Sequence, residues 1–326
     1  MKYALPILLA ALTLGACSDS TKPASFSVVP EAVVAAAAPT EKVPKIALVM
    51  KTLTNPFFIE MEKGARRAEA EFKVELQVRT AAQETSIEQQ IQIVNDLIAA
   101  HVDAIVIAPG DSSSLIPVLQ KAAAAGIKLV NIDNRLNPQA LKKAGLAPLP
   151  FVSVDNEQAA YASALFIAEG ARSGTQAAIL EGIRSADNAQ QRLAGARRAF
   201  GKNKGISLVA SESANWKIDE GYSVTKKIFL TKPQVKLLFA ANDMMVLGAL
   251  KYLQESGRST VKVAGYDALE EAVIAVKAGQ LAVTVNQQAG EQGFQGVALA
   301  VRLLRGQSVP EVSLIDTKLV TRESLN

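Results

Sequence analysis

From residue 45 onward, the spacing of apolar residues switches between that of a strand and that of a helix. Residues Lys45–Met50 form a short apolar run, and from Pro56 apolar side chains recur every three or four residues, as on one face of a helix. Val74, Leu76 and Val78 then alternate with polar residues, which is the period of a half-buried strand. The globular part of the chain is therefore predicted to begin with a strand, a helix and a second strand.

The same alternation continues along the chain. Further strands are expected at 104–107, 127–132, 151–154, 178–180, 207–209, 236–239 and 261–263, and helices at 87–98, 115–125, 159–170 and 188–200. The side chains of 111–114 are expected to cap the helix at 115–125. Repeated strand–helix units predict parallel sheets with helices on both faces, and the restart near residue 151 predicts two doubly wound α/β domains. Ligands of such sheets bind beyond the carboxyl ends of the strands.

Composition and charge exclude several classes of protein. Of 326 residues, 49% are apolar and 20% charged, which predicts a globular protein rather than a disordered one. The formal net charge is only +4 and no Lys/Arg block is present, which argues against nucleic-acid binding. One cysteine and one histidine argue against metal sites and a Ser-His-Asp triad. No phosphate-binding G-x-x-x-x-G-K-S/T loop occurs, so we expect no cofactor and an ATPase on a separate protein.

The N-terminus has the pattern of a secretory signal. A short apolar run from Ala4 to Leu14 follows Lys2, and small residues precede Cys17. Residues 14–17 resemble a bacterial lipobox, which implies cleavage before Cys17 and its acylation; the alternative is a plain signal with an incidental cysteine. We expect a signal peptide at 1–16 and a lipid-anchored flexible tether at 17–43, which place the protein in the periplasm or at the cell surface, on the inner or the outer membrane.

Polar and aromatic side chains gather in the loops after the predicted strands. Aromatic residues make up only 5% of the chain, so several of them in loops form a notable pattern. Carboxylate and amide groups can pair with sugar hydroxyls, and the C–H face of a pyranose packs on an aromatic ring. These loop residues include Lys51, Asn55, Phe57, Phe58, Asp133, Asn134, Trp216, Asn242, Asp267 and Gln287.

Several of these motifs, taken in order, resemble the periplasmic pentose- and hexose-binding proteins of ABC transporters, the ribose, allose and galactose group. The resemblance covers about residues 43–325. It is carried by Lys51–Phe58, Leu129–Asp133, Phe239–Asp243, Leu247–Leu250, Val263–Asp267 and Thr284–Gln287.

The resemblance implies a type I periplasmic binding protein fold, in which two doubly wound lobes are joined by three crossings of the chain. The crossings are expected near 153–154, 286–287 and 316–317. One lobe would then comprise 44–153 plus 288–316, and the other 154–287 plus 317–326.

The family also implies roles for individual residues. Asn55 would hydrogen-bond a sugar, Phe57 and Phe58 would stack on one face of its ring, and Trp216 would stack on the other face. Arg192 is placed among the ligand residues by its spacing to Gly195 in the following helix, and Arg197 and Arg198 are nearby alternatives. The remaining polar ligand positions fall on Asp133, Asn242, Asp267 and Gln287.

The chain departs from the ribose pattern at two places. Asn134 stands where ribose binders carry an arginine, and Ala108 stands where they carry an asparagine. Lys51 and the segment 141–145 instead resemble the allose-type subgroup, although Asn134 differs from that pattern too. The sugar is therefore left open.

The predicted site has balanced formal charge, because Asp133 and Asp267 face Lys51 and Arg192. Such a site predicts a neutral monosaccharide or polyol rather than a sugar acid. We expect a monomeric, non-enzymatic binding protein that delivers this ligand to the permease subunits of an ABC transporter. The alternatives are a sugar sensor that docks on a chemoreceptor or histidine kinase, a LacI-type regulator and a glycoside hydrolase.

Overall fold

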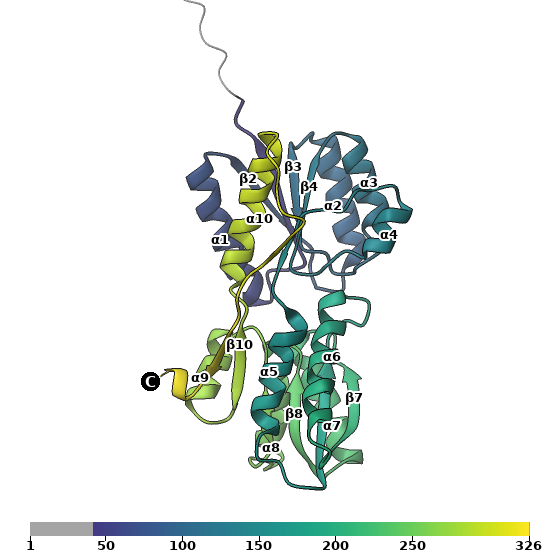
Figure 1. Cartoon of the computed structure of the whole chain (residues 1–326). Coiled ribbons are helices and arrows are strands. Elements are labelled where there is room, and N and C mark those ends of the chain that lie inside the picture. Colours follow the sequence, from purple (N-terminus) through teal and green to yellow (C-terminus); the bar gives the residue numbers. More distant parts are fainter. Residues whose placement is uncertain (1–41, 326) are drawn as a thin grey trace, which may run out of the picture. The chain divides into compact units, whose positions relative to one another are not determined.

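The computed structural model describes residues 42–325, which contain two six-stranded sheets flanked by helices (Figure 1). Cys17 and the predicted signal and tether lie outside the described residues. The first sheet consists of β1 (Lys45–Met50), β2 (Glu75–Thr80), β3 (Ala104–Ile107), β4 (Lys128–Ile132), β5 (Phe151–Ser153) and β11 (Val312–Leu314). The second sheet consists of β6 (Thr175–Glu181), β7 (Ile206–Ser213), β8 (Val235–Ala240), β9 (Lys262–Ala264), β10 (Val283–Asn286) and β12 (Lys318–Thr321).

The two sheets repeat one topology. Their strand orders are β11-β5-β4-β3-β1-β2 and β12-β10-β9-β8-β6-β7, so the strand that starts each unit lies one place from the edge. All paired strands are parallel except β10 and β12, which are antiparallel. This arrangement confirms the predicted pair of doubly wound α/β units and places the strand-order reversal next to β1 and β6.

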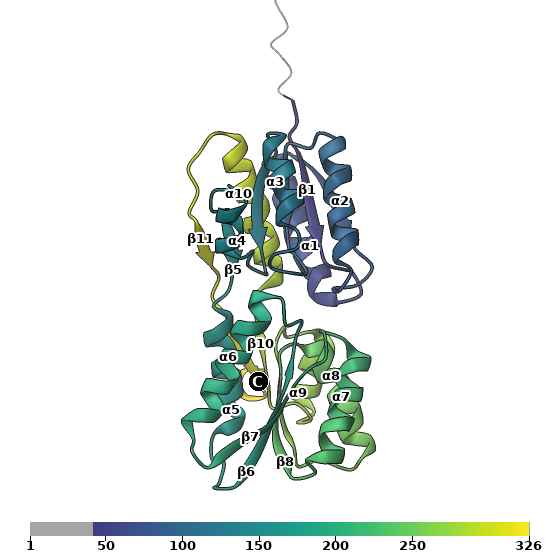
Figure 2. The same cartoon turned by 90° about the vertical axis from the view of Figure 1, so that its right-hand side faces the viewer.

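Helices cover both faces of each sheet, and Figure 2 shows the same layers from the side. The helices packed on the first sheet are α1 (Pro56–Phe72), α2 (Ile87–Ala99), α3 (Ile116–Ala124) and α10 (Ala289–Leu304), and the short α4 (Pro138–Lys143) joins the same core through Leu141. The helices packed on the second sheet are α5 (Asn156–Ala168), α6 (Asp187–Lys202), α7 (Ile218–Thr231), α8 (Asp243–Glu255) and α9 (Glu270–Lys277). A short 3-10 turn, Glu323–Leu325, ends the described chain. We call the first sheet with its helices the N-terminal lobe and the second sheet with its helices the C-terminal lobe.

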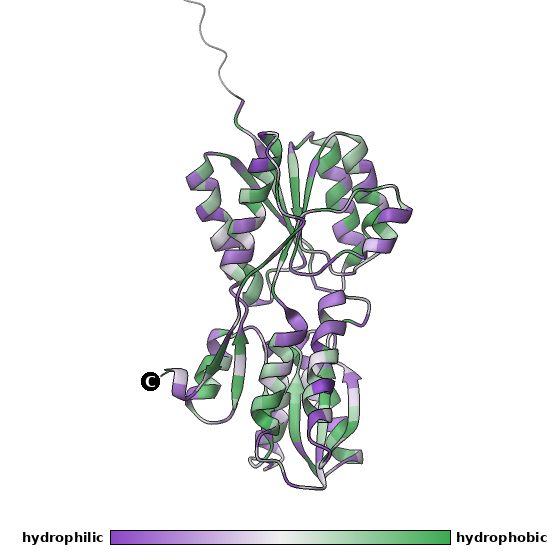
Figure 3. Cartoon of the chain, in the orientation of Figure 1, coloured by the Kyte–Doolittle hydropathy of each residue, from purple (hydrophilic) through white to green (hydrophobic). Residues whose placement is uncertain are grey.

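Alternation along β1 explains why helices are needed on both faces. Ile46, Leu48 and Met50 belong to the core shared with α1 and α10, whereas Ala47 and Val49 belong to the core shared with α2 and α3. The strand is therefore apolar throughout, which is typical of a parallel strand buried on both faces. In Figure 3 the inner strands are accordingly mostly hydrophobic, whereas the edge strands β2 and β7 also carry hydrophilic residues. Several helices carry one hydrophobic and one hydrophilic side.

The chain passes between the lobes three times. It does so between β5 and α5, between β10 and α10, and between β11 and β12. The strands β11 and β12 have three and four residues, lack a buried apolar run and were not predicted. β12 can pair antiparallel because it reaches β10 without a crossover helix.

The predicted cap of α3 was wrong. The helix begins at Ile116, and its N-cap residue Leu115 makes no side-chain capping bond. Asp111 Oδ1 instead accepts hydrogen bonds from the backbone N–H groups of Ser113 and Ser114, at 2.7 and 2.6 Å. These bonds close a tight turn ahead of the helix, because an Asp side chain readily binds N–H groups two and three residues on.

Candidate functional site

A small cavity that opens to solvent is lined by residues of both lobes. All predicted ligand residues line it except Asn134, and two further residues, Glu84 and Asn188, were not predicted. The lining consists of Lys51, Asn55, Phe57, Phe58, Glu84, Asp133, Asn188, Arg192, Trp216, Asn242, Asp267 and Gln287.

The loop between β1 and α1 presents the two phenylalanines. Asn55 is the N-cap of α1, and its side-chain oxygen accepts a hydrogen bond from Phe57 N at 3.1 Å. Pro56 follows at the first helical position, where its fixed φ and missing N–H do no harm. The rings of Phe57 and Phe58 meet edge to face, with centroids 5.0 Å apart. Local helix-start chemistry therefore fixes the aromatic side of the cavity.

A buried charge cluster lies beside these rings. Lys51 Nζ is 2.7 Å from Asp133 Oδ2 and 3.9 Å from Glu84 Oε2. Glu84 Oε1 accepts a 2.9 Å hydrogen bond from Asn55 Nδ2. Burial raises the pKa of Glu84, and the positive charge of Lys51 opposes that rise. One lysine thus serves two carboxylates, and each of them contributes to the cavity wall.

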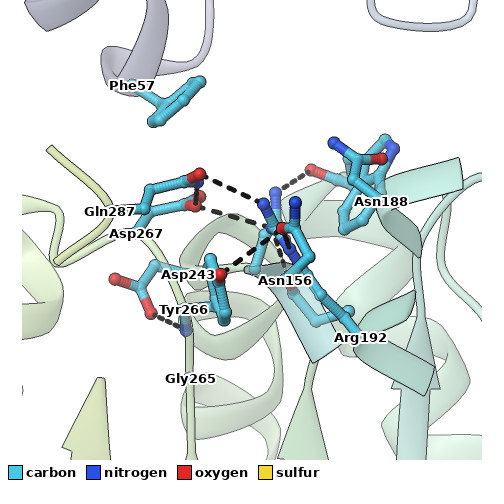
Figure 4. Close-up of polar contacts among 12 residues, drawn as sticks. Phe57, Asn156, Asn188, Arg192, Asp243, Gly265, Tyr266, Asp267 and Gln287 are labelled. Carbon is cyan, nitrogen blue, oxygen red and sulfur yellow. Dashed lines mark hydrogen bonds and ion pairs between the residues drawn. The ribbon is translucent and has the colours of Figure 1, made fainter. Parts of the chain in front are cut away.

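Arg192 is the centre of the C-terminal half of the site (Figure 4). Its guanidinium donates from Nε to Asn156 Oδ1 at 2.8 Å, from Nη1 to Ala241 O at 2.8 Å and from Nη2 to Gln287 Oε1 at 3.3 Å. It also lies over the ring of Tyr266, 3.7 Å from the centroid. These contacts hold the planar group rigidly, as is usual for a buried arginine.

The two nearby arginines lie elsewhere. Arg197 Nη2 donates to Ser211 Oγ at 3.4 Å, and Arg198 forms an exposed ion pair with Glu157 at 2.7 Å. Of the three candidates on this helix, the structure brings Arg192 to the cavity.

Asp267 completes this half of the site. Its Oδ1 lies 3.7 Å from Arg192 Nη1 and accepts a 2.6 Å hydrogen bond from Gln287 Nε2. Burial raises the pKa of Asp267 well above its ordinary value, against the opposing charge of Arg192. The side chain is only 3% exposed, so the charged carboxylate loses most of its hydration, and this loss disfavours the charged form.

A second buried carboxylate shapes the loop that carries Asp267. Asp243 accepts hydrogen bonds from Tyr266 N at 2.9 Å and Leu269 N at 3.0 Å, and Thr284 Oγ1 donates to it at 2.9 Å. Asp267 itself has φ 124, in the left-handed half of backbone space that only glycine adopts easily. Asp243 does not line the cavity, so its role is to hold this loop.

Trp216 forms the aromatic wall from the C-terminal lobe. Its ring packs directly on Gly182, where a β-carbon would overlap the indole. Its carbonyl accepts a 3.3 Å hydrogen bond from Asn242 Nδ2, while Asn242 Oδ1 caps α8 by accepting from Met245 N at 2.9 Å. Within residues 42–325, Trp216 Nε1 and Asn188 Oδ1 are buried without a hydrogen-bond partner, and Asp133 Oδ2 has only its ion pair with Lys51. The residues that line the cavity therefore include an unpaired donor and an unpaired acceptor.

Asn134 lies behind the cavity wall. It is fully buried, its Nδ2 donates to Pro109 O at 3.0 Å, and its Oδ1 accepts from Asn188 N at 3.2 Å. A strand-end position alone could not distinguish this role from a ligand contact.

The sequence contains features that could have identified Asn188 and Glu84, the two lining residues that were not predicted. Asn188 precedes Arg192 by four residues, which puts both side chains on one face of α6. Glu84 stands in the loop after β2, where the strand-end rule applies as it does to Lys51.

The described part of the chain has neither a membrane-spanning helix nor a metal-binding cluster. Among residues 42–325, no helix is both long enough and apolar enough to cross a bilayer. Nor does that part of the chain contain a group of three His, Cys, Asp or Glu side chains that could hold a metal ion.

Residues 46–308 match the family described as the periplasmic binding protein domain. The chain belongs to this family. The periplasmic binding protein is 40% identical over 306 residues to the D-ribose/D-allose-binding protein of Pseudomonas aeruginosa, with 92% of each chain covered. It is 33% identical to the D-allose-binding periplasmic protein of Escherichia coli, with 85% of this chain and 91% of the relative covered.

A solved structure is also similar. It is the crystal structure of an ABC transporter periplasmic solute-binding protein from Actinobacillus succinogenes with bound D-allose, at 38% identity and a TM-score of 0.81. The match covers 86% of this chain and 98% of that one. The fold predicted from the sequence resemblance is thereby confirmed.

Proposed function

We propose that this periplasmic binding protein binds a neutral monosaccharide or related polyol in the cavity and delivers it to an ABC transporter. The observation that carries the proposal is the lining itself, which combines the rings of Phe57, Phe58 and Trp216 with buried charged and amide groups. Similar proteins are named for D-ribose and D-allose, and one similar structure holds D-allose. These relatives support a neutral monosaccharide as the ligand and leave aldose, ketose and polyol open.

The chemistry of the lining suits sugar hydroxyls. Each hydroxyl donates one hydrogen bond and accepts others, so it can bridge a donor and an acceptor on the protein. Trp216 Nε1 supplies a buried donor, and Asn188 Oδ1 supplies a buried acceptor. The aromatic rings supply flat apolar surfaces for the C–H faces of the sugar.

The charge of the lining favours a neutral ligand. The predicted balance of charge was incomplete, because Glu84 adds a third carboxylate to Asp133 and Asp267 against the two cations Lys51 and Arg192. Three acidic side chains of the lining therefore face two basic ones, so no positive charge is left over to bind a sugar phosphate or uronate.

Ligand capture would work by movement of two lobes. We propose lobes of 44–153 plus 288–316 and of 154–287 plus 317–326, with the chain crossings as hinges. A sugar that contacts both lobes favours the closed form because it binds that form better. The permease subunits would recognise the closed protein, a separate ATPase would supply the energy, and the binding protein would act as a monomer without catalysing a reaction.

The anchor is proposed from the sequence. Periplasmic binding proteins act outside the cytoplasm, and a lipidated Cys17 after a 1–16 signal would hold this one on a membrane through the 17–43 tether. Replacing Cys17 by serine should release the protein from the membrane fraction. Membrane association that persists in this variant would contradict the anchor while leaving the sugar site untouched.

A thermal-shift screen tests the function. Neutral aldoses, ketoses and polyols are compared with uronates and sugar phosphates, since a ligand that binds only the folded state raises the melting temperature. We expect one neutral sugar to give the largest shift, and Asp267→Ala to abolish most of it. A larger shift with a sugar phosphate or uronate, or none with any neutral sugar, would contradict the proposal.

A further inference from the structure

Helix α6 begins without a cap from its own lobe. The residue at its N-cap position is Ala186, which makes no side-chain capping bond. The first N–H groups of a helix have no partner inside the helix and need outside acceptors. In α6, the backbone N–H groups of Asp187 and Asn188 at the first two helical positions need such acceptors.

Their acceptors come from the N-terminal lobe. Asp187 N donates to Ser112 Oγ at 2.9 Å, and Asn188 N donates to Asn134 Oδ1 at 3.2 Å. Ser112 N in turn donates to Ser185 O at 3.2 Å. Three hydrogen bonds donated by backbone N–H groups therefore join the start of α6 to the loops after β3 and β4 of the other lobe.

The two acceptors are held firmly in place. Asn134 donates to Pro109 O at 3.0 Å, and its carbonyl accepts from Asn131 Nδ2 at 2.8 Å. Ser112 Oγ lies 3.4 Å from Asn134 Oδ1, to which it can donate while it accepts from Asp187 N. An arginine in place of Asn134 would have no acceptor atom and could not make this cap.

The capped turn carries residues of the cavity. Asn188 and Arg192 both line it and lie one turn apart on α6. Asn188 Nδ2 also lies 3.4 Å from Asp133 Oδ1, so this turn meets the N-terminal half of the site. The position of the first turn of α6 therefore sets where these two side chains stand relative to the sugar.

We propose that Ser112 and Asn134 are positioning residues for sugar binding, which cap α6 across the lobe boundary when the lobes are together. The inference rests on the proposed function and adds a role for two residues outside the cavity. Opening the lobes breaks the cap and leaves the N–H groups of Asp187 and Asn188 to water. The cap thus stabilises the arrangement that holds the sugar and slows its release.

The test compares Ser112→Ala with Ser112→Thr, which keeps the hydroxyl. Sugar release and capture are followed by stopped-flow fluorescence of Trp216, the only tryptophan in the chain. Amide hydrogen exchange at Asp187 and Asn188 reports the cap itself. Asn137→Ala is the matched control, because Asn137 caps α4 within the N-terminal lobe through Ala140 N at 2.9 Å.

Ser112→Ala should speed sugar release about three- to tenfold, the size of a lost N-cap, and change the association rate less than about twofold. Exchange at Asp187 should become faster, while the melting temperature without sugar stays that of the wild type. Ser112→Thr should restore slow release. Asn137→Ala should lower the melting temperature with and without sugar and leave release unchanged.

Unchanged release in a folded Ser112→Ala protein would overturn the proposal, as would unchanged exchange at Asp187. An equal loss of melting temperature with and without sugar would show a purely structural role and would also overturn it. If the wild-type protein binds no sugar, the proposed function fails and this inference fails with it, whereas sugar binding by the wild type with unchanged release in Ser112→Ala overturns this inference alone.

Discussion

Arg192 and Asp267 face each other in the cavity wall, with Nη1 3.7 Å from Oδ1, and Gln287 bonds to both. The gap is longer than that of a direct hydrogen bond, so Gln287 completes the connection between the two charges. Removing one member of a buried ion pair leaves the other without compensation. The three side chains therefore act as one unit.

Asp267→Ala should weaken sugar binding at least about tenfold, because a hydrogen bond to a charged group contributes about 1.5–3 kcal/mol. Isothermal titration calorimetry measures the change. Glu270→Ala, an exposed carboxylate three residues away, is the control and should bind as the wild type does. Wild-type affinity in Asp267→Ala would remove Asp267 from the site.

Gly182→Ala should displace the indole of Trp216, because the new β-carbon would overlap its ring. We expect a loss of sugar affinity of about tenfold or more, together with a changed tryptophan emission spectrum.

Gly201→Ala is the matched control for this change. It lies in α6, no atom would lie within 4 Å of its new β-carbon, and alanine favours a helix by up to about 1 kcal/mol. This variant should be slightly more stable and bind sugar normally. Equal binding by the two glycine variants would show that the position of Trp216 does not matter.

Asp243 predicts a specific pH dependence of stability. Burial raises the pKa of Asp243 to about 7 from an ordinary value of 3.8. The folded protein therefore binds a proton on Asp243 more tightly than the unfolded chain does, and this proton binding stabilises the fold. The stabilisation is fully present below the unfolded pKa and is lost as the pH rises through about 7.

The comparison is with Asp243→Asn, which cannot titrate. Urea unfolding between about pH 5 and pH 8 should show the wild type losing stability relative to this variant as the pH rises. The pKa of Glu84 is also raised and those of Asp103 and Asp111 are lowered, but these three groups are common to both proteins. The charge of Asp243 contributes to the raised pKa of Asp267, so the difference between the two proteins reports both of these buried carboxyls. A difference that does not change with pH would contradict the raised pKa.

Glu84→Gln should relax the selection against acidic sugars. The amide keeps an oxygen that accepts from Asn55 Nδ2, but the third carboxylate of the cavity is gone. We expect the affinity for a uronate relative to its parent aldose to rise about three- to tenfold, as measured by calorimetry. A ratio equal to that of the wild type would show that Glu84 does not set the charge preference.

The fold was largely predictable because its strands are buried on both faces. Apolar runs such as Lys45–Met50 stand out, and the helices between them show a regular apolar face. The strands β11 and β12 were missed because short, partly exposed strands lack both signals. Their place in the sheets depends on pairing with strands far away in the sequence, and the local pattern of apolar residues does not indicate such pairing.

The site was predictable where its residues follow strands, as for Lys51 and Asp267. It was less predictable where function depends on which way a side chain points. Asn188 and Asn134 are neighbours through a hydrogen bond at 3.2 Å, yet only Asn188 reaches the cavity. The contact joins residues far apart in sequence, so only the folded chain shows which of the two asparagines faces inward.

The decisive experiment is calorimetric titration with D-allose, D-ribose and their phosphate and uronate counterparts. We expect saturable binding of a neutral sugar at one site, tighter than that of any acidic counterpart and at least about tenfold weaker in Asp267→Ala. Tighter binding of an acidic sugar, or neutral-sugar binding that does not change in Asp267→Ala, would contradict it.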